Sequence, residues 1–335
     1  MRFGVATPNC CEVLLYPLGF ASHESMVKIA QKAEKLGYDS VWANDHMTTQ
    51  DYVKQLSPQP PNYFEPLVSL SFIAEATSRI RLGTSVVVLP LRNPVVVAKQ
   101  VATLDTLSGG RMILGVGAGA YKEEFEALNP STPTKARATI MDESVHALKK
   151  LFTETRSTFN GKYVKFSGVE MYPKPVQKPL PLWMGGNSLN GIRRTAEVGT
   201  GWSPAILSPR EIEEGVARLR NYAMKLGRGD FQFEVAPQYT VCIAKTEDEA
   251  VEKFKDSLAY KHLVSLQKST LRAQSIESFM DRNLIGTPDR IAKKIEELKQ
   301  AGATYLPDLV IPANSLEEML DSMEMFANEV MPRFL

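Results

Sequence analysis

A histidine stands beside an acid where one apolar run of this sequence ends. The stretch VWANDHM, residues 41–47, closes with Asp45 and His46, at a point where a buried strand would emerge into water. Because imidazole titrates near neutral pH, His46 could donate or accept a proton during catalysis. A lone histidine is more often a hydrogen-bonded structural group. The sequence therefore makes His46 a candidate catalytic residue and keeps the structural interpretation open.

Small and polar residues also follow two other predicted strands. Residues 84–86 (TSV) end one apolar run, and GVGAG spans residues 115–119 in the next. The glycines of GVGAG are spaced G-x-G-x-G, which differs from the G-x-G-x-x-G loop that binds dinucleotides. They favour a tight bend instead, or a close approach of the backbone at Gly117 to a flat ligand.

A third glycine-containing stretch, MGGNS, lies between a predicted strand and a predicted helix. It contains Gly185, Gly186, Asn187 and Ser188. Backbone amides at such a junction, together with the helix N-terminus, can bind an anion such as a phosphate. Asn187 or Ser188 could equally be an ordinary helix cap. Both interpretations stay open on the residues alone.

Other kinds of site find little support in the sequence. LSGGR, residues 107–111, precedes a strand, so Arg111 is expected to pin a turn or to reach along the sheet. The four histidines show no HExxH spacing and no nearby acid cluster, which predicts that there is no metal site. A G-x-S-x-G elbow is absent, and no lysine follows a predicted strand, which disfavours a hydrolase, an aldolase or an isomerase.

The elements that would position these residues alternate between short apolar runs and amphipathic helices. Eight strand–helix units without a domain-sized linker predict one α/β domain over residues 1–335, a (β/α)8 TIM barrel. The stretches 48–62 and 263–285 would be insertions at its C-terminal rim. An open doubly wound sheet is the alternative, but the loop after the first strand lacks phosphate-loop glycines. The predicted strands are 2–6, 39–43, 79–90, 112–119, 180–186, 201–202, 238–244 and 304–312. The predicted helices are 25–36, 65–77, 94–107, 135–153, 189–198, 209–226, 247–262, 286–302 and 315–329.

Composition excludes several classes of partner. The net charge of +1 and the absence of like-charge blocks predict no nucleic-acid partner and no polybasic membrane patch. No stretch approaches the apolar length of a membrane span. Three cysteines, two of them adjacent, predict reduced thiols. We therefore expect a soluble, cytoplasmic protein.

Three long stretches, taken in order and spacing, resemble the luciferase-like monooxygenase family of flavin and deazaflavin oxidoreductases. They are GYDSVWANDHM, ATSRIRLGTSVVVLPLRNPVVVAKQVATLDTLSGGRMILGVGAGAYKEEFEAL and PKPVQKPLPLWMGGNS. The resemblance is tight over residues 37–128 and 172–202. VLPLRNP and the Asp–His pair are most similar to the branch that uses the deazaflavin F420. The resemblance implies a (β/α)8 barrel that binds F420 or FMN at its C-terminal rim, with F420 favoured.

The family resemblance also assigns roles to particular positions. It implies that Ser85 and Val86 form a non-proline cis peptide, a bulge that backs the cofactor's ring system. It implies that Arg111 and residues 185–188 hold the cofactor's phosphate. One position departs from the family, because Tyr121 stands where a tryptophan is common. This departure leaves the wall of the substrate pocket unassigned.

The implied activity is that of a two-electron oxidoreductase. His46 would be the catalytic proton donor or base, and Asp45 would lie near the cofactor. Hydride transfer with F420, or monooxygenation with FMN supplied by a separate reductase, would act on a small organic substrate. The alternative is a non-catalytic flavin-binding protein of the same fold. Relatives are commonly homodimers, and helices 65–77 and 94–107 could form the interface.

Overall fold

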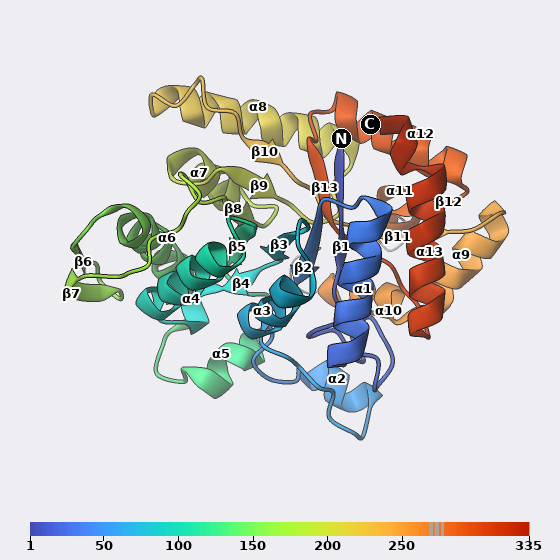
Figure 1. The fold of residues 1–335 in the computed structure, drawn as a ribbon, viewed down its shortest axis with the longest axis horizontal. Helices are drawn as coiled ribbons and strands as arrows, with labels where there is room; N and C mark the ends of the chain where they lie inside the picture. The colour runs from blue at the N-terminus through green and yellow to red at the C-terminus, as the bar shows by residue number, and fades with distance from the viewer. Residues whose placement is uncertain (268–270, 272–274, 276–277, 335) are drawn as a thin grey trace.

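A curled sheet of parallel strands forms the centre of the computed structural model, and helices pack around its outer surface (Figure 1). The structure describes residues 1–267, 271, 275 and 278–334. Among these residues, the sheet has the order β10-β9-β8-β5-β3-β2-β1-β13-β11-β12, with β4 beside β5. Its strands are β1 Arg2–Ala6, β2 Ser40–Ala43, β3 Arg81–Thr84, β4 Val87–Val88, β5 Met112–Gly117, β8 Leu182–Gly185, β9 Gly201–Ser203, β10 Glu234–Val235, β11 Tyr239–Ile243, β12 Leu284–Gly286 and β13 Tyr305–Val310.

Helices connect most successive strands and give the chain its α/β character. They are α1 His23–Leu36, α2 Asp51–Leu56, α3 Pro66–Ala76, α4 Pro94–Leu107, α5 Lys122–Leu128, α6 Arg137–Thr153, α7 Leu189–Glu197, α8 Pro209–Lys225, α9 Glu247–Asp256, α10 Leu258–Leu266, α11 Ser278–Arg282, α12 Pro288–Gln300 and α13 Leu316–Glu329. Local signals set several of their ends. Gly37 has φ 86° and ends α1, as its sequence predicts. Thr287 caps α12 by accepting the Arg290 amide hydrogen.

Aromatic side chains fill the inside of the curled sheet. The rings of Trp42 and Trp183 stack with centroids 5.1 Å apart, and Tyr305 meets both rings edge-on. The strands leave room for these rings through glycines. A Cβ atom at Gly83 would lie 2.4 Å from the Trp42 ring, and one at Gly201 would lie 2.6 Å from Trp183. This cluster is a packed core on which the site-bearing strand ends rest.

The eight predicted strands correspond to strands of the structure, and most predicted helices lie within two residues of observed ones. The run 79–90 differs, because it divides into β3 and β4. The predicted helix 247–262 is two helices, α9 and α10, with Ser257 between them. Helix α2 lies inside the expected insertion 48–62, and α5 lies between a predicted strand that ends at residue 119 and a predicted helix that begins at residue 135.

Two further segments were not anticipated by the hydrophobic pattern. Strands β6 Ser157–Asn160 and β7 Lys165–Val169 form a separate antiparallel hairpin, which Figure 1 shows at the edge of the molecule. Its side chains are largely exposed, so it carries no strong apolar signal. The expected insertion 263–285 falls partly outside the described residues, at 268–270, 272–274 and 276–277.

The hydrogen-bonded order is open, with β10 and β12 at its two ends, whereas the sequence predicts a closed barrel. The difference arises because β10, which pairs with β9, and β11, which pairs with β12 and β13, are separate strands with residues 236–238 between them. Within the described ranges, no helix is long and apolar enough to cross a membrane. The three cysteines are buried and unbridged.

Candidate active site

The C-terminal ends of β2, β3, β5 and β8 bring most of the expected site residues together. A non-proline cis peptide joins Ser85 to Val86 at the end of β3, where the resemblance placed one. The Val86 side chain lies against the ends of both β5 and β8. A Cβ atom at Gly117 would be 2.4 Å from a Val86 methyl group, and one at Gly185 would be 2.9 Å from the other. These two glycines therefore make room for the bulge at residues 85–86.

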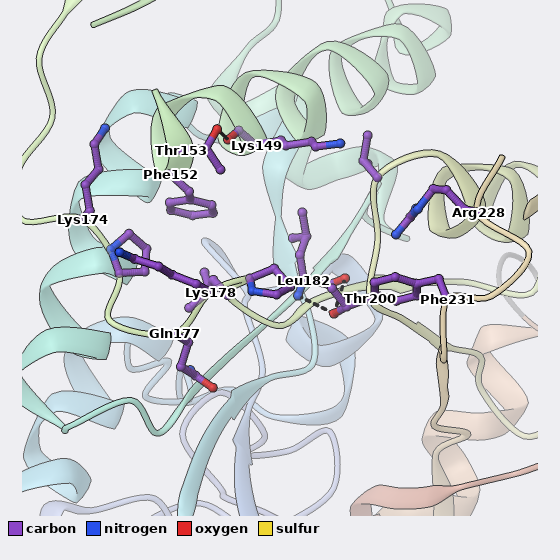
Figure 2. A pocket seen from close by; sticks show the side chains of 14 residues that line it. Lys149, Phe152, Thr153, Lys174, Gln177, Lys178, Leu182, Thr200, Arg228 and Phe231 are labelled. Carbon is purple, nitrogen blue, oxygen red and sulfur yellow. Dashed lines mark hydrogen bonds between the residues drawn. The ribbon is translucent and has the colours of Figure 1, made fainter. Parts of the chain in front are cut away.

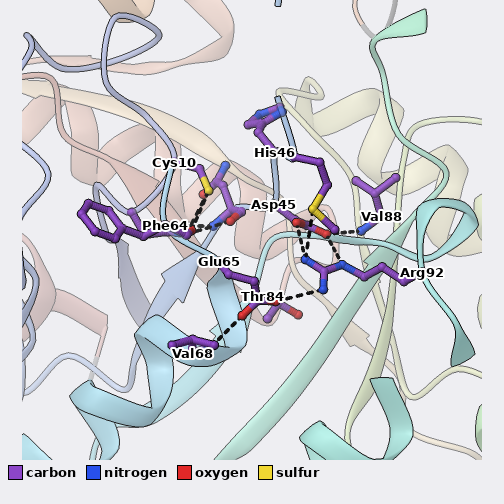
Figure 3. Close-up of polar contacts among 12 residues, drawn as sticks. Cys10, Asp45, His46, Phe64, Glu65, Val68, Thr84, Val88 and Arg92 are labelled. Carbon is purple, nitrogen blue, oxygen red and sulfur yellow. Dashed lines mark hydrogen bonds and ion pairs between the residues drawn. The ribbon is translucent and has the colours of Figure 1, made fainter. Parts of the chain in front are cut away.

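A buried ion pair holds this bulge to the end of β2 (Figure 3). The Asp45 carboxylate accepts hydrogen bonds from Nε and Nη2 of Arg92 at 2.9 and 2.7 Å, and from the Val88 amide at 2.9 Å. Nη1 of Arg92 lies 3.0 Å from Oε1 of Glu65. These contacts within the protein already occupy the Asp45 carboxylate. Asp45 therefore positions the residues around the bulge, and it does not need the expected contact with a cofactor to complete its hydrogen bonds.

His46 has two different partners at one ring nitrogen. Its Nδ1 lies 2.8 Å from the Gln50 amide nitrogen and 3.4 Å from Oε1 of Glu124. The Tyr63 hydroxyl donates to Oε1 of Gln50 at 3.0 Å, which orients the Gln50 amide with its N–H groups toward His46. The Glu124 carboxylate is almost fully buried and also accepts the Met47 amide hydrogen.

With these two partners, Nδ1 of His46 can be hydrogen-bonded in either tautomer of the ring. When the Gln50 amide donates to Nδ1, the ring proton is on Nε2. When Nδ1 carries a proton, the Glu124 carboxylate accepts it. Nε2 can therefore either present or accept a proton, which is the property that a general acid–base residue needs.

An aromatic wall flanks His46. The rings of Tyr63 and Tyr121 lie 5.8 and 5.6 Å from the imidazole, and Tyr52 stacks loosely beside Tyr121. The Tyr52 hydroxyl is 2.7 Å from Nδ1 of His262 on α10. Desolvation, with a smaller contribution from His46, lowers the pKa of His262 to about 3, so its imidazole is neutral at pH 7. Sequence patterns did not single out Tyr52, Tyr63 or His262, because they lie on different segments of the chain.

A buried carboxyl group contacts the bulge from inside the sheet. Burial raises the pKa of Asp308, on β13, to about 7, and a hydrogen bond with the Ser85 hydroxyl offsets part of this rise. Oδ1 of Asp308 has no hydrogen-bond partner within the described residues. The Gln238 amide in turn donates to the Ser85 hydroxyl. Ser85 thus connects the bulge to a carboxyl group that titrates near neutral pH.

The MGGNS loop leaves backbone amides exposed at the start of α7. Gly186 has φ 111°, and the space where its Cβ would lie is open. Asn187 is occupied, because its side chain accepts the Ala205 amide hydrogen and donates to the Ala205 carbonyl. Ser188 is the N-cap residue, yet in the described chain its side chain does not bond the first-turn amides. Those amides can therefore donate hydrogen bonds to a bound anion.

Arg111 lies away from these residues. It precedes β5, whereas Gly117 ends that strand, so the two are about 20 Å apart along an extended chain. Its guanidinium donates to the carbonyls of Ala74 and Ile80 and to the Thr77 hydroxyl. The expected phosphate contact is not reproduced, because Arg111 is engaged in fastening the end of α3.

No group of three or more potential metal-ligating side chains was found in the described part of the chain. The site thus combines a bulge seated on glycines, one acid–base histidine with two Nδ1 partners, and an anion-accepting helix start. Asn44 adds a buried amide oxygen without a hydrogen-bond partner among the described residues. An unpaired polar atom of this kind fits a site that a polar ligand completes.

The chain belongs to the luciferase-like monooxygenase family, whose model matches residues 1–305, and it is an oxidoreductase. It is 34% identical to an F420-dependent glucose-6-phosphate dehydrogenase of Kineococcus radiotolerans, covering 84% of this chain and 85% of the relative. It is 27% identical to an FMNH(2)-dependent dimethylsulfone monooxygenase of Pseudomonas putida, covering 91% and 86%. The structure of the monooxygenase RslO1 from Streptomyces bottropensis superimposes with a TM-score of 0.83 at 23% identity, covering both chains fully.

Asp308 makes the stability of the protein depend on pH. Its folded-state pKa of about 7 lies above the ordinary value of 3.8, so the folded state retains a proton that the unfolded state has lost. Stability should therefore fall as pH rises from about 4 to about 7 and then level off. Urea unfolding of Asp308→Asn should show a smaller loss between about pH 5 and about pH 8 than the unchanged protein shows.

Asp321→Asn, an exposed carboxyl on α13, is the matched control and should follow the unchanged protein. If Asp308→Asn loses as much stability as the unchanged protein does over the same rise in pH, Asp308 is not the titrating group.

Proposed function

We propose that this protein transfers a hydride between the deazaflavin F420 and a small organic substrate at the C-terminal ends of β2, β3, β5 and β8. The observation that carries the proposal is the bulge at Ser85–Val86, seated on Gly117 and Gly185 close to His46. A flat, dry backing is what a ring system needs if its other face is to meet a substrate. The 34% identity to an F420-dependent dehydrogenase supports the choice of F420.

The residues at this end of the sheet fit such a cofactor. The first-turn amides of α7 and the open loop at Gly186 would hold its phosphate. The backbone at residues 85–86 would support the ring, with Asp45 and Arg92 fixing the bulge from behind. The unpartnered Asn44 oxygen is available to a polar edge of the ring. When bound, the cofactor supplies the two-electron redox chemistry.

His46 would move the proton that accompanies hydride transfer. Its Nε2 would face a substrate hydroxyl or carbonyl, while Gln50 and Glu124 hold Nδ1. When Nε2 acts as a base, Glu124 accepts a hydrogen bond from the protonated Nδ1. When Nε2 acts as a proton donor, the Gln50 amide donates a hydrogen bond to the unprotonated Nδ1. The tyrosine wall around His46 would exclude water from this step.

FMN-dependent oxygenation is a second candidate, because an FMNH(2)-dependent monooxygenase is similar over 91% of this chain. It would need a separate reductase to supply reduced flavin.

A closed (β/α)8 barrel would suit either cofactor. Closure is supported by the segment between β10 and β11, where the Gln238 amide bonds the Pro204 carbonyl beside β9, and the Thr304 amide bonds the Val235 carbonyl.

Replacement of His46 tests the proposed proton transfer. His46→Ala should lower turnover with F420 by about 10²–10⁴-fold while cofactor affinity stays nearly unchanged, because the imidazole moves a proton and does not hold the cofactor. Glu124→Gln should lower turnover less and should shift the pH profile, since it removes the negative charge of the group that accepts the Nδ1 proton. Cofactor affinity is measured by titration with F420 and, in parallel, with FMN.

His146→Ala, a histidine on α6 outside the site, is the control and should keep full activity. Unchanged turnover in His46→Ala would return His46 to a structural role. Tight binding of FMN without binding of F420 would favour the oxygenase instead.

We also propose that the protein is a homodimer that pairs through α3 and α4. Large apolar side chains are exposed on these neighbouring helices, including Val68 at 54%, Phe72 at 57% and Leu107 at 81%. Light scattering should give twice the chain mass of 37.2 kDa. Phe72→Glu should shift this mass toward the monomer, because it places a charge in an apolar interface. Met224→Glu, exposed on α8, should leave the mass unchanged, and a monomeric unchanged protein would contradict the proposal.

A further inference from the structure

A cavity of about 580 Å³ lies at the opposite end of β8 from the candidate active site, and Figure 2 shows its lining. It is bounded by the end of α6, the segment 174–180 that leads into β8, and the turn that follows α8. Leu182 lines it at the start of β8, while Gly185 at the other end of that strand belongs to the active site. These two residues lie about 10 Å apart along β8, so the cavity and the candidate active site are at opposite ends of this strand.

The charge of this cavity is of one sign. Its lining includes Lys149, Lys174, Lys178 and Arg228, and no aspartate or glutamate is among the described residues that line it. A hollow lined by several cations and bounded by apolar walls concentrates anions. The full chain has a net charge of only +1, so this cluster is a local feature and not a reflection of composition.

Two of the four cations are held in place by backbone carbonyls. Nζ of Lys174 donates to the carbonyls of Leu151 and Glu154, which fixes it at the end of α6. Arg228 donates to the carbonyls of Ala196 and Gly199 at the end of α7. These contacts order the two side chains and offset the partial negative charge of the two helix ends.

The other two cations have no such partner. Neither Lys149 nor Lys178 forms an ion pair in the described part of the chain, although ion pairs are frequent elsewhere on the surface. Figure 2 shows that they extend from different segments, Lys149 from α6 and Lys178 from the chain before β8. Their charges are thus the ones available to a bound anion.

Apolar side chains form the rest of the lining. Phe152 and Phe231 lie on opposite sides of the cavity in Figure 2, and Leu182 lies between them. The Arg228 guanidinium lies 4.5 Å from the centre of the Phe231 ring, which fixes that ring in place. A cavity of this size, mostly apolar with a few convergent polar groups, has the properties of a small-molecule site.

We propose that this cavity is a second binding site, one that takes a small anion with a flat apolar body. The aromatic walls formed by Phe152 and Phe231 would receive the flat body, and Lys149 and Lys178 would pair with a carboxylate, sulfonate or phosphate group. The site is independent of the proposed cofactor, because none of its residues lies at the C-terminal ends of the strands.

Anilinonaphthalene sulfonate is a suitable probe, because it combines a fused aromatic body with one anionic group. Its binding is followed by calorimetry on the full-length protein, with and without saturating F420 or FMN. One molecule per chain should bind in both conditions. The double variant Lys149→Gln with Lys178→Gln should weaken binding about tenfold, as the loss of two partly exposed charge pairs implies. Thr153→Trp should also weaken it by filling the cavity from α6.

Two controls distinguish this site from nonspecific adsorption. The pair Lys225→Gln with Lys293→Gln makes the same charge change at exposed positions elsewhere and should leave the affinity unchanged. Phenylnaphthylamine, the uncharged analogue, should bind equally to the unchanged protein and to the double lysine variant at positions 149 and 178. The proposal is overturned if the probe does not saturate at one site, if cofactor displaces it, or if the two lysine pairs behave alike. Because the probe is tested without cofactor as well, a failure of the proposed function does not decide this result.

Discussion

The buried pairing of Asp45 with Arg92 is the interaction on which the arrangement of the site depends. It joins the end of β2 to the chain that follows the bulge at residues 85–86, and the Val88 amide completes the contact. Removal of Arg92 would leave the buried Asp45 carboxylate uncompensated, and breaking a buried pair in this way typically costs about 3–5 kcal/mol. Since Asp45 immediately precedes His46, the same contact also fixes the position of the His46 backbone, from which the candidate catalytic side chain extends. One ion pair thus fixes the backing of the site and the residue that would move protons.

Glycine in this site serves packing more than direct contact with a ligand. Val86 occupies the space that side chains at Gly117 and Gly185 would need, and the Thr84 carbonyl occupies the space at Gly115. Two strands, β5 and β8, therefore have to end in glycine if the bulge is to enter the curled sheet, and β5 needs a second glycine at residue 115. Gly186 differs from these, because the space beside it is open and its backbone is available to a ligand. Gly117 and Gly185 thus share one physical role although they belong to different motifs, whereas the adjacent Gly185 and Gly186 of MGGNS have different roles that the sequence alone does not distinguish.

Much of the fold was predictable because its signals are local. Gly37 ends α1 and Thr287 begins α12 through contacts within a few residues, and the apolar strands reflect burial on both faces. The site was predictable only where a residue follows a strand directly, as His46 does. The Asp45–Arg92 pair spans 47 residues, and the contact of Ser85 with Gln238 spans 153, so no periodicity reveals either. Arg111 pins the LSGGR turn through the Ser108 carbonyl, as its residues predict, but its contacts with the end of α3 depend on carbonyls that no local pattern reveals.

The central claim is that a deazaflavin or flavin ring rests against the bulge at residues 85–86. It is tested most directly by measuring the affinity of Gly117→Ala for F420 and FMN. The added methyl group would lie 2.4 Å from Val86, so the bulge must shift. We expect cofactor binding to weaken by about tenfold or more while the protein stays folded, because small displacements matter in such a site. Unchanged affinity in a folded variant whose bulge has moved would contradict it.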